Sequence, residues 1–397
     1  MSNATRRVDT VIVGGGIAGT ALAYYLARGG ADDIVLLERD QLGSGMTAQS
    51  FSGVRQQFST PLEIELSKRG LRFWKTCEEQ FDSPCPFDQC GYLLVTSRPE
   101  VMQKFAESAA LQRELGAGPV EILSPEGVHA VAPWLVTDDL AGGCYTPEDG
   151  RVTGTDGVAA LAKGARSHGV DIRQWSPVTA IERSAHGYRV IGPKDTIDAR
   201  RVVVAAGLWS SALLEPLGLE IDVFPVELHY ALTTPTLEGK TVPLTIDFDT
   251  GFCIEREGSG LVVSMLVSDS PPGYGQQEML ESWFTAATTR APTLVNLGIS
   301  HVLSAPVDEV SDGHPNAGRM EEELWVLAGL AGHGVMHGPV LAELLARTML
   351  GDPDQTVDVT PCNPLRTPQR SLDSEWMATP IRESSVSNEL STSRETN

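Results

Sequence analysis

The sequence is poor in cysteine, and the cysteines it has are scattered. They form no CxxC pair and no group with histidines at zinc-ligand spacing: Cys77, Cys85, Cys90, Cys144, Cys253 and Cys362. Disulfide frameworks and structural zinc sites need such clustering. We therefore expect reduced thiols, no metal site and a cytoplasmic location.

Long apolar runs and an excess of positive charge are also missing. No window approaches the roughly 18 apolar residues of a membrane-spanning helix, and the first apolar run, 11–13, passes directly into glycines. Lysine and arginine number 30 against 52 aspartate and glutamate, a net charge of −22. Such a charge repels phosphate backbones, so we expect no nucleic-acid partner. Because no apolar run is long enough, we also expect no membrane span.

What remains is the composition of a globular protein of two or three domains, with 397 residues of which 41% are hydrophobic. Near the N-terminus, the β-branched run 8–13 predicts a buried parallel strand, and the GxGxxG motif Gly14–Gly19 follows it. A helical pattern then ends at Gly29, and a second apolar run, 34–37, ends in Glu38. This order predicts a βαβ unit that binds a dinucleotide; a glycine-rich turn without a ligand is the alternative.

Each residue type in this unit suits a dinucleotide. Gly14 permits the tight turn, Gly16 lets the backbone approach a pyrophosphate, and Gly19 allows close packing of helix on strand. The helix start offers free N–H groups to the diphosphate. Glu38 can accept hydrogen bonds from an adenosine ribose and disfavours the 2′-phosphate of NADP. The predicted site comprises Gly14, Gly16, Ile17, Ala18, Gly19 and Glu38.

A second glycine-rich strand-to-helix turn lies about 310 residues after the first. The apolar run 324–328 predicts a strand, Gly329–Met336 forms the turn, and a helix is expected over about 338–350. Another buried strand, from residue 201, ends in the small residues Ala205-Ala206-Gly207 before Trp209.

These motifs together resemble the D-amino-acid oxidase superfamily of flavoproteins, in particular its glycine oxidase, sarcosine oxidase and dimethylglycine dehydrogenase branch. The resemblance covers about residues 8–350 and also includes Glu38-Arg39, Gly53-Val54-Arg55 and Ser311–Pro315. It implies an α/β fold in which a discontinuous Rossmann-like FAD-binding domain is interleaved with an antiparallel-sheet, α+β substrate domain. By this resemblance the FAD-binding domain takes 8–85, 142–222 and 300–350, and the substrate domain takes 86–141 and 223–299. Residues 371–397 are rich in Ser and Thr and predict a disordered tail.

The resemblance also implies which further residues contact FAD. The loop 43–58 would pass beneath the flavin, and backbone N–H groups of the C-terminal turn would stabilise negative charge on the reduced ring. The additional cofactor-binding residues are Arg39, Ser44, Thr47, Ser52, Gly53, Val178, Ala206, Gly207, Trp209, Gly332, His333, Gly334, Val335 and Met336.

Substrate contacts are expected from Arg55 and from the strands of 223–299. Arg55 matches the arginine that binds the substrate carboxylate in sarcosine oxidase relatives, and a surface ion pair is its alternative role. His229, Tyr230 and Arg256 are the polar candidates of the sheet, although a lone strand histidine also suits a structural role. The sequence identifies no catalytic base.

The sequence departs from the resembled family at four positions. Relatives that bond FAD covalently use a histidine where Ser50 falls or a cysteine near Ala305, so we expect non-covalent FAD. Monomeric sarcosine oxidases also have a lysine that promotes the reaction with oxygen and a second lysine that binds the substrate carboxylate. In this sequence Val262 takes the place of the first and Met336 that of the second. An oxidase and a dehydrogenase that uses another electron acceptor therefore both remain open, and the lost carboxylate-binding lysine puts a small amino-acid substrate in question.

The sequence thus predicts an FAD-dependent amine or amino-acid oxidase or dehydrogenase. It would oxidise a C–N bond of a secondary amine or N-substituted amino acid by hydride transfer to flavin N5, giving an imine. A non-catalytic FAD-binding assembly or scaffold protein and an NAD-dependent dehydrogenase are the alternatives. No HExxH motif and no Ser/His/Asp or Cys/His arrangement points to another chemistry.

Overall fold

The first sheet is built around the N-terminal strand β1. In the computed structural model, which describes residues 6–194, 196–235, 242–266, 273–368 and 375–377, β1 pairs in parallel with β2 and β11. The strand order is β17-β18-β11-β1-β2-β8, with β9 and β10 extending from β11. The bounds are β1 Arg6–Val13, β2 Ile34–Leu37, β8 Asp171–Arg173, β9 Ala180–Ser184, β10 Gly187–Ile191, β11 Thr196–Val204, β17 Asn316–Glu321 and β18 Leu324–Ala328.

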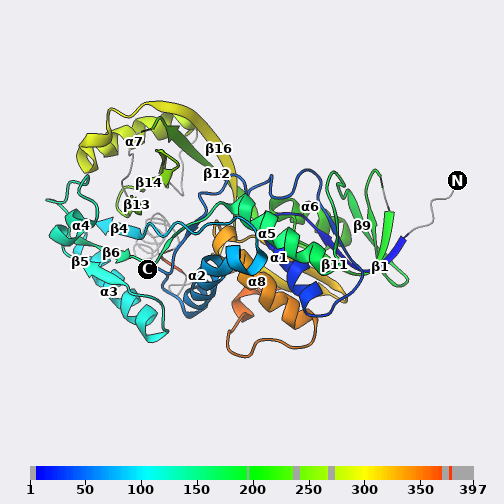
Figure 1. The fold of residues 1–397 in the computed structure, drawn as a ribbon. Coiled ribbons are helices and arrows are strands. Elements are labelled where there is room, and N and C mark those ends of the chain that lie inside the picture. Colours follow the sequence, from blue (N-terminus) through cyan, green and yellow to red (C-terminus); the bar gives the residue numbers. More distant parts are fainter. Residues whose placement is uncertain (1–5, 195, 236–241, 267–272, 369–374, 378–397) are drawn as a thin grey trace, which may run out of the picture.

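Both faces of this sheet are covered, which explains the almost continuous apolar run of β1. Ile12 packs among the helices on one face, whereas Val11 and Val13 pack toward the other. Helices from distant parts of the chain meet on the first face, where Figure 1 shows α1 (blue) next to α8 (orange). The helices are α1 Ile17–Arg28, α2 Pro61–Phe81, α5 Gly154–Ser167 and α8 Gly334–Met349, and the short α6 Ser210–Leu214 packs on the opposite face.

The second sheet is antiparallel except at one junction. Its order is β16-β12-β15-β14-β13-β4-β6-β5, and only β13 and β4 run parallel among its described pairs. The bounds are β4 Tyr92–Thr96, β5 Glu121–Leu123, β6 Gly142–Thr146, β12 Phe224–Thr233, β13 Leu244–Asp247, β14 Phe252–Glu257, β15 Gly260–Met265 and β16 Ile299–Glu309. The long pair β12 and β16 arches from the first sheet toward α7 (Figure 1).

Helices cover this sheet as well. Helices α4 and α7 share one apolar cluster with its strands, and α3 shares another. Their bounds are α3 Pro99–Glu114, α4 Pro125–Val131 and α7 Gln276–Arg290. A small sheet pairs β3 Gly53–Val54 with β7 Gly150–Arg151. In chain order, each of these strands stands between a strand of the first sheet and a strand of the second. The described 3-10 helices are Gly207–Trp209, Glu215–Leu217, Pro292–Leu294 and Thr360–Cys362.

The strand pairing differs from the predicted domain boundaries at two strands. β6 begins at residue 142 and β16 ends at 309, and both were assigned to the FAD-binding domain by the sequence. The structure pairs β6 with β4 and β16 with β12, so both belong to the second sheet. Their sequences carry no signal of this, because the choice of partner is made by non-local hydrogen bonds.

The predicted disordered tail is wrong for residues 375–377. Glu375 is 3% exposed, and its carboxylate accepts hydrogen bonds from the backbone N–H groups of Ser59 and Thr60 at 2.7 and 3.0 Å. Met377 is 1% exposed and packs in the apolar cluster around α3. This short segment therefore holds the two residues that precede α2; the rest of 371–397 lies outside the described residues.

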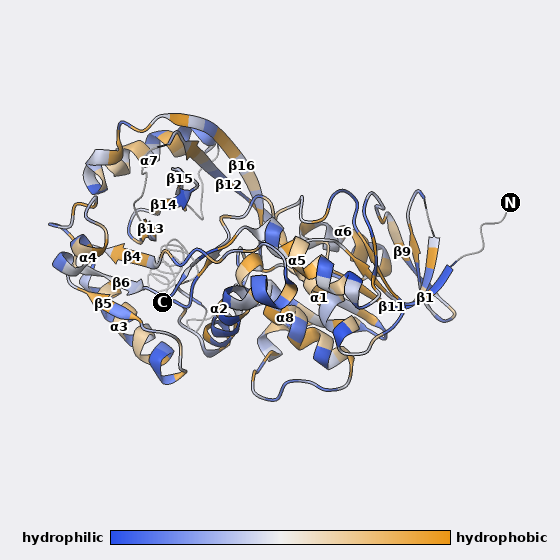
Figure 2. Cartoon of the chain, in the orientation of Figure 1, coloured by the Kyte–Doolittle hydropathy of each residue, from blue (hydrophilic) through white to orange (hydrophobic). Residues whose placement is uncertain are grey.

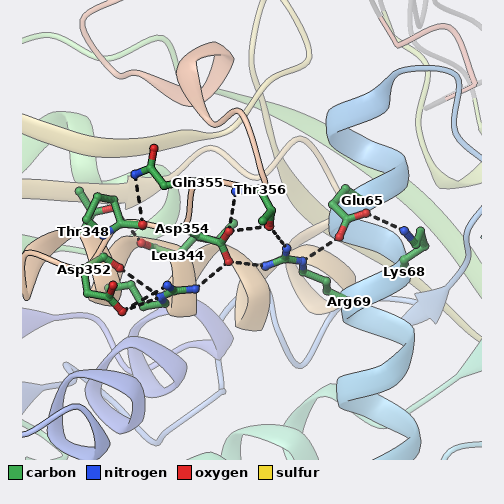
Figure 3. A network of polar contacts seen from close by, with 11 residues as sticks. Glu65, Lys68, Arg69, Leu344, Thr348, Asp352, Asp354, Gln355 and Thr356 are labelled. Carbon is green, nitrogen blue, oxygen red and sulfur yellow. Dashed lines mark hydrogen bonds and ion pairs between the residues drawn. The ribbon is translucent and has the colours of Figure 1, made fainter. Parts of the chain in front are cut away.

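A polar network fastens the segment after α8 to α2 (Figure 3). The Asp354 carboxylate accepts hydrogen bonds from Arg69 of α2 at 2.9 Å and from Arg347 of α8 at 2.7 Å. The hydroxyl and backbone N–H of Thr356, together with Arg69, hold the pKa of Asp354 well below its ordinary value. Figure 2 shows the outward side of α2 as largely hydrophilic, which suits a helix that is stabilised on its outer face by such pairs.

The described part of the chain contains no helix that could span a membrane. It also contains no group of three His, Cys, Asp or Glu that could hold a metal ion. All six cysteines are buried, and none of them forms a disulfide.

Candidate cofactor site

A cavity of about 650 Å³ opens where the carboxyl ends of the first sheet face the second sheet. Its lining includes the turn after β1, the loop 43–53, residues 177–179 and 205–207, and the turn before α8. Strands β12, β13 and β16 contribute from the second sheet. In open α/β sheets, ligands bind at this edge.

The turn after β1 has the geometry that a pyrophosphate requires. Gly14 has φ +114°, and a Cβ there would lie 2.3 Å from the carbonyl oxygen of Ala205. A Cβ on Gly19 would lie 2.0 Å from the carbonyl oxygen of Gly14, so this glycine allows the helix to approach the turn. Helix α1 begins after Gly16 with no acidic residue in its first turn, and its positive end faces the cavity.

The acidic residue at the end of β2 is held in place by backbone hydrogen bonds. The two oxygens of the Glu38 carboxylate accept hydrogen bonds from the backbone N–H groups of Gly15 at 2.7 Å and Asp40 at 2.8 Å. Next to it, the guanidinium of Arg39 lies 3.7 Å from the ring centre of Trp209, a cation–π contact at the cavity wall. Glu38 is therefore positioned to accept ribose hydroxyls, and the stacked pair borders the same end of the cavity.

The loop 43–53 packs between α1 and α5. Thr47 Oγ1 accepts a hydrogen bond from the N–H of Ile17 at 3.2 Å, and Ser44 donates to the carbonyl of Gln41 at 2.8 Å. A Cβ on Gly154, the first residue of α5, would lie 3.0 Å from the Thr47 carbonyl and 3.1 Å from Ser52 Oγ. These close contacts explain why a small, polar sequence is needed here.

The segment after this loop passes to the second sheet. The Gln57 side chain donates hydrogen bonds to the carbonyls of Tyr92 and Cys144 at 3.2 and 3.0 Å. The buried Asp149 carboxylate accepts the N–H of Gln56 at 2.9 Å, and burial raises the pKa of Asp149 to about 7. The segment is thus fastened to β4, to β6 and to the turn that follows β6.

Arg55 lies in this segment and lines the cavity, 3% exposed. Its guanidinium donates to the carbonyl of Gln57 at 2.9 Å and to that of Met377 at 2.8 Å. It also lies over the ring of Phe58 at 4.4 Å. The arginine is therefore oriented by the backbone on one side while the cavity reaches it on another.

The structure brings nearly all of the predicted cofactor-binding residues to this one cavity. The lining includes Gly14, Gly16, Ile17, Ala18, Glu38, Arg39, Ser44, Thr47, Ser52, Gly53, Val178, Ala206, Gly207, Trp209, Gly332, His333, Gly334, Val335 and Met336. Gly19 does not line it and supports the turn from behind.

Three predicted substrate residues are not brought to the cavity. His229 is 6% exposed, and its Nδ1 lies 2.7 Å from the hydroxyl of Ser304 on the neighbouring strand. Tyr230 contacts the edge of Phe51, which does line the cavity. Arg256 donates to the carbonyl of Gly258 within its own hairpin. The alternation of side chains along β12 and the position of Arg256 in a hairpin explain these placements, so we assign none of the three to the substrate site.

Sequence reasoning missed the cavity residues that the second sheet supplies. Tyr92, Glu227, Leu244, Ile246 and Asp308 all line the cavity. Alternation along β12 and β13 marks one face of each strand, but it does not say which face meets the cofactor domain. The acidic pair Asp308-Glu309 at the end of β16 was the available signal.

The residues present fit FAD. The turns after β1 and before α8 line the same cavity, and its volume lies in the range of cofactor pockets. A Cβ on Gly16 would meet only Thr47 Oγ1, at 3.3 Å, so the space beside this glycine is open to a ligand. Fold and site together define a dinucleotide-binding protein with an antiparallel second domain.

The family model of FAD dependent oxidoreductases, DAO, matches residues 9–348. The chain belongs to this family, and its cofactor is FAD. This finding confirms the recognised family and the predicted fold class, and it sets aside the NAD-dependent dehydrogenase.

Several characterised relatives are similar to the chain. Dimethylglycine dehydrogenase of Rattus norvegicus is 28% identical over 375 residues, which cover 87% of this chain and 43% of that protein. Glycine oxidase of Bacillus licheniformis is 26% identical over 363 residues, covering 88% and 95%. The pyruvate dehydrogenase phosphatase regulatory subunit of Mus musculus is 26% identical over 375 residues, covering 88% and 42%. The chain spans less than half the length of the first and third of these proteins.

Among solved structures, L-proline dehydrogenase from P. horikoshii is similar with a TM-score of 0.83 and 25% identity. The similarity covers 91% of this chain and 98% of that one. This likeness shows that the two-sheet arrangement described above is a known fold.

Proposed function

We propose that this chain binds FAD without a covalent bond and oxidises a C–N bond of a secondary amine or N-substituted amino acid. The observation that carries the proposal is that two glycine-rich turns, about 310 residues apart, line one cavity with Glu38 and Arg55. The relatives named above include an oxidase and dehydrogenases of amino acids, which supports this substrate class.

Residues of this chain would divide the binding of FAD and substrate among them. The start of α1 would bind the diphosphate, and Glu38 would accept the ribose hydroxyls. The N–H groups of Gly334 and Val335 would face the flavin ring, where the positive end of α8 favours negative charge. Arg55 would bind a substrate carboxylate through its guanidinium.

When bound, FAD would supply a two-electron acceptor for the hydride of the carbon beside the amine nitrogen, and water would hydrolyse the resulting imine. The apolar lining from Leu244, Ile246 and Leu266 would exclude water from this face. We propose no catalytic base, since an unprotonated amine needs none.

The absence of a covalent link is supported at both expected positions. Ser50 lines the cavity where some relatives use histidine, and Ala305 stands on β16 where others use cysteine. Neither side chain can form the known flavin linkages. Oxygen or another carrier would reoxidise the cofactor.

The decisive experiment is an absorption spectrum of the purified protein, followed by anaerobic addition of amines. Flavin bands that bleach with N-methyl amino acids support the proposal. Heat denaturation should release the flavin into the supernatant. A protein that is colourless, or whose flavin remains in the pellet, would contradict the cofactor part.

A non-catalytic FAD-binding scaffold is the second candidate. It is favoured by the similarity to a phosphatase regulatory subunit, and no lysine is among the described residues that line the cavity. A yellow protein whose bands stay oxidised with every secondary and primary amine tested would support this candidate over the enzyme.

A further inference from the structure

The turn between β18 and α8 holds three residues in the left-handed region. Gly329 has φ +62°, Ala331 has φ +50° and Gly332 has φ +74°. For alanine this conformation costs about 1 kcal/mol, so the turn needs contacts that hold it. A Cβ on Gly329 would lie 2.6 Å from Val223 and 2.9 Å from Asn316, which leaves no space to relax on that side.

Asp308 of β16 supplies such contacts. Its Oδ2 accepts a hydrogen bond from the N–H of Leu330 at 2.8 Å, and the backbone N–H of Gly332 also donates to the carboxylate. The side chain is 8% exposed and lines the cavity. A carboxylate from the second sheet therefore fastens the turn of the first.

The charge of Asp308 is not neutralised by a cation in the described part of the chain. The titratable groups that line the cavity near it are Glu309 of the same strand, Glu227 of the paired β12 and His333 of the turn. Burial raises the pKa of Asp308 to about 6, so the group is ionised at pH 8. A negative charge thus lies beside the turn that would face the flavin.

We propose that Asp308 is a positioning residue that holds the Gly329–Gly334 turn and lowers the reduction potential of the flavin facing it. The inference rests on the proposed function, because it needs FAD at this turn. Reduction adds negative charge to the flavin ring, and a buried carboxylate repels that charge while the start of α8 attracts it. Removing the carboxylate charge therefore favours the reduced form.

The test is the midpoint potential of bound FAD in wild type, Asp308→Asn and Asp308→Glu. The amide keeps an acceptor for the two N–H groups and removes the charge. At pH 8, D308N should favour reduction about tenfold, about 30 mV for a two-electron couple. At pH 5, where the wild-type carboxyl is protonated, D308N and the wild type should have the same midpoint potential. D308E should keep the wild-type midpoint potential at pH 8.

Asp222→Asn is the matched control. The Asp222 carboxylate likewise accepts a backbone N–H, that of Ser311 at 2.6 Å, but it does not line the cavity. A D308N potential equal to that of D222N at pH 8 overturns the inference while leaving the proposed function intact. Failure of the wild-type protein to bind FAD would instead refute the proposed function.

If D308N alone releases its FAD, titration of the wild-type protein removes the same charge. A plot of potential against pH should then bend near pH 6, and the bend should persist in His333→Gln, which removes the nearby imidazole. A plot without that bend overturns the inference.

Discussion

At the scale of single residues, steric fit around Gly14 decides whether the dinucleotide site can form. A Cβ at this position would lie 2.3 Å from the Ala205 carbonyl oxygen, in a backbone conformation that L residues rarely adopt. Such contacts explain why the motif could be recognised from sequence: the turn tolerates no side chain.

Gly14→Ala is expected to destabilise the protein by about 3 kcal/mol and to abolish FAD binding, because the turn must move to admit the methyl group. Urea unfolding and the flavin content of the purified variant measure both effects. Gly45→Ala is the control, since Gly45 lines the cavity and its Cβ would meet nothing within 4 Å. Equal losses in the two variants would contradict the steric explanation.

Arg55→Met tests the carboxylate role of Arg55. A lost charged hydrogen bond of about 1.5–3 kcal/mol should weaken carboxylate-bearing amines 10- to 100-fold and neutral amines much less. Titration of the flavin spectrum with both kinds of ligand measures the difference. Arg256→Met is the control, because this arginine lies outside the cavity lining. Its substitution should change the affinity for carboxylate-bearing and neutral amines equally. An equal loss for both ligands in Arg55→Met would reject the role.

At the scale of elements, helix boundaries follow local signals, whereas strand partners do not. Thr60, Pro61 and Glu63 form a local signal for the start of a helix, and α2 spans Pro61–Phe81. The C-terminal helix begins at Gly334, four residues before the predicted start, because Gly334–His337 complete its first turn. The sequence places β6 and β16 with the FAD-binding segments, whereas the structure pairs them with β4 and β12 of the second sheet.

Asp354→Asn tests the network that joins α2 to the segment after α8 (Figure 3). Asp354 is 10% exposed and binds two arginines, so the substitution should cost about 1–2 kcal/mol at pH 7. The folded-state pKa is lowered, so this stabilisation is present above the unfolded pKa of about 3.9 and is lost as pH falls further. In urea unfolding, the difference in the free energy of unfolding between the wild type and Asp354→Asn should become smaller below about pH 4.

Asp352→Asn is the control for this network. Asp352 pairs with the same Arg347 but is 79% exposed, so its loss should change the free energy of unfolding by less than about 0.5 kcal/mol. A cost equal to that of Asp354→Asn would show that burial of the ion pair contributes nothing.

At the scale of the whole molecule, the cavity belongs to neither domain alone. The first sheet contributes its carboxyl ends, the second sheet contributes β12, β13 and β16, and Gln57 joins the segment from Gly53 to Phe58 to the second sheet. FAD in this cavity would contact both domains, so binding should stabilise the entire fold.

Removal of FAD is therefore expected to lower the melting temperature, and adding it back should restore the loss. At 100 times its Kd, FAD should add about 2.7 kcal/mol of stability. Thermal unfolding of FAD-free protein at increasing FAD concentrations measures the effect, with NAD as the control ligand. A shift of equal size with NAD would contradict the specificity of the site for FAD.

The sequence alone determined the βαβ unit, the two glycine turns and the residues that line the cofactor end of the cavity. These features depend on local backbone geometry, and short motifs record such geometry directly. Only the tertiary structure decided that Asp308 meets the C-terminal turn, that Glu375 binds the residues before α2, and that His229 and Arg256 lie outside the cavity lining. Those outcomes depend on which strands pair and which faces pack, and such long-range choices leave no fixed spacing in the chain.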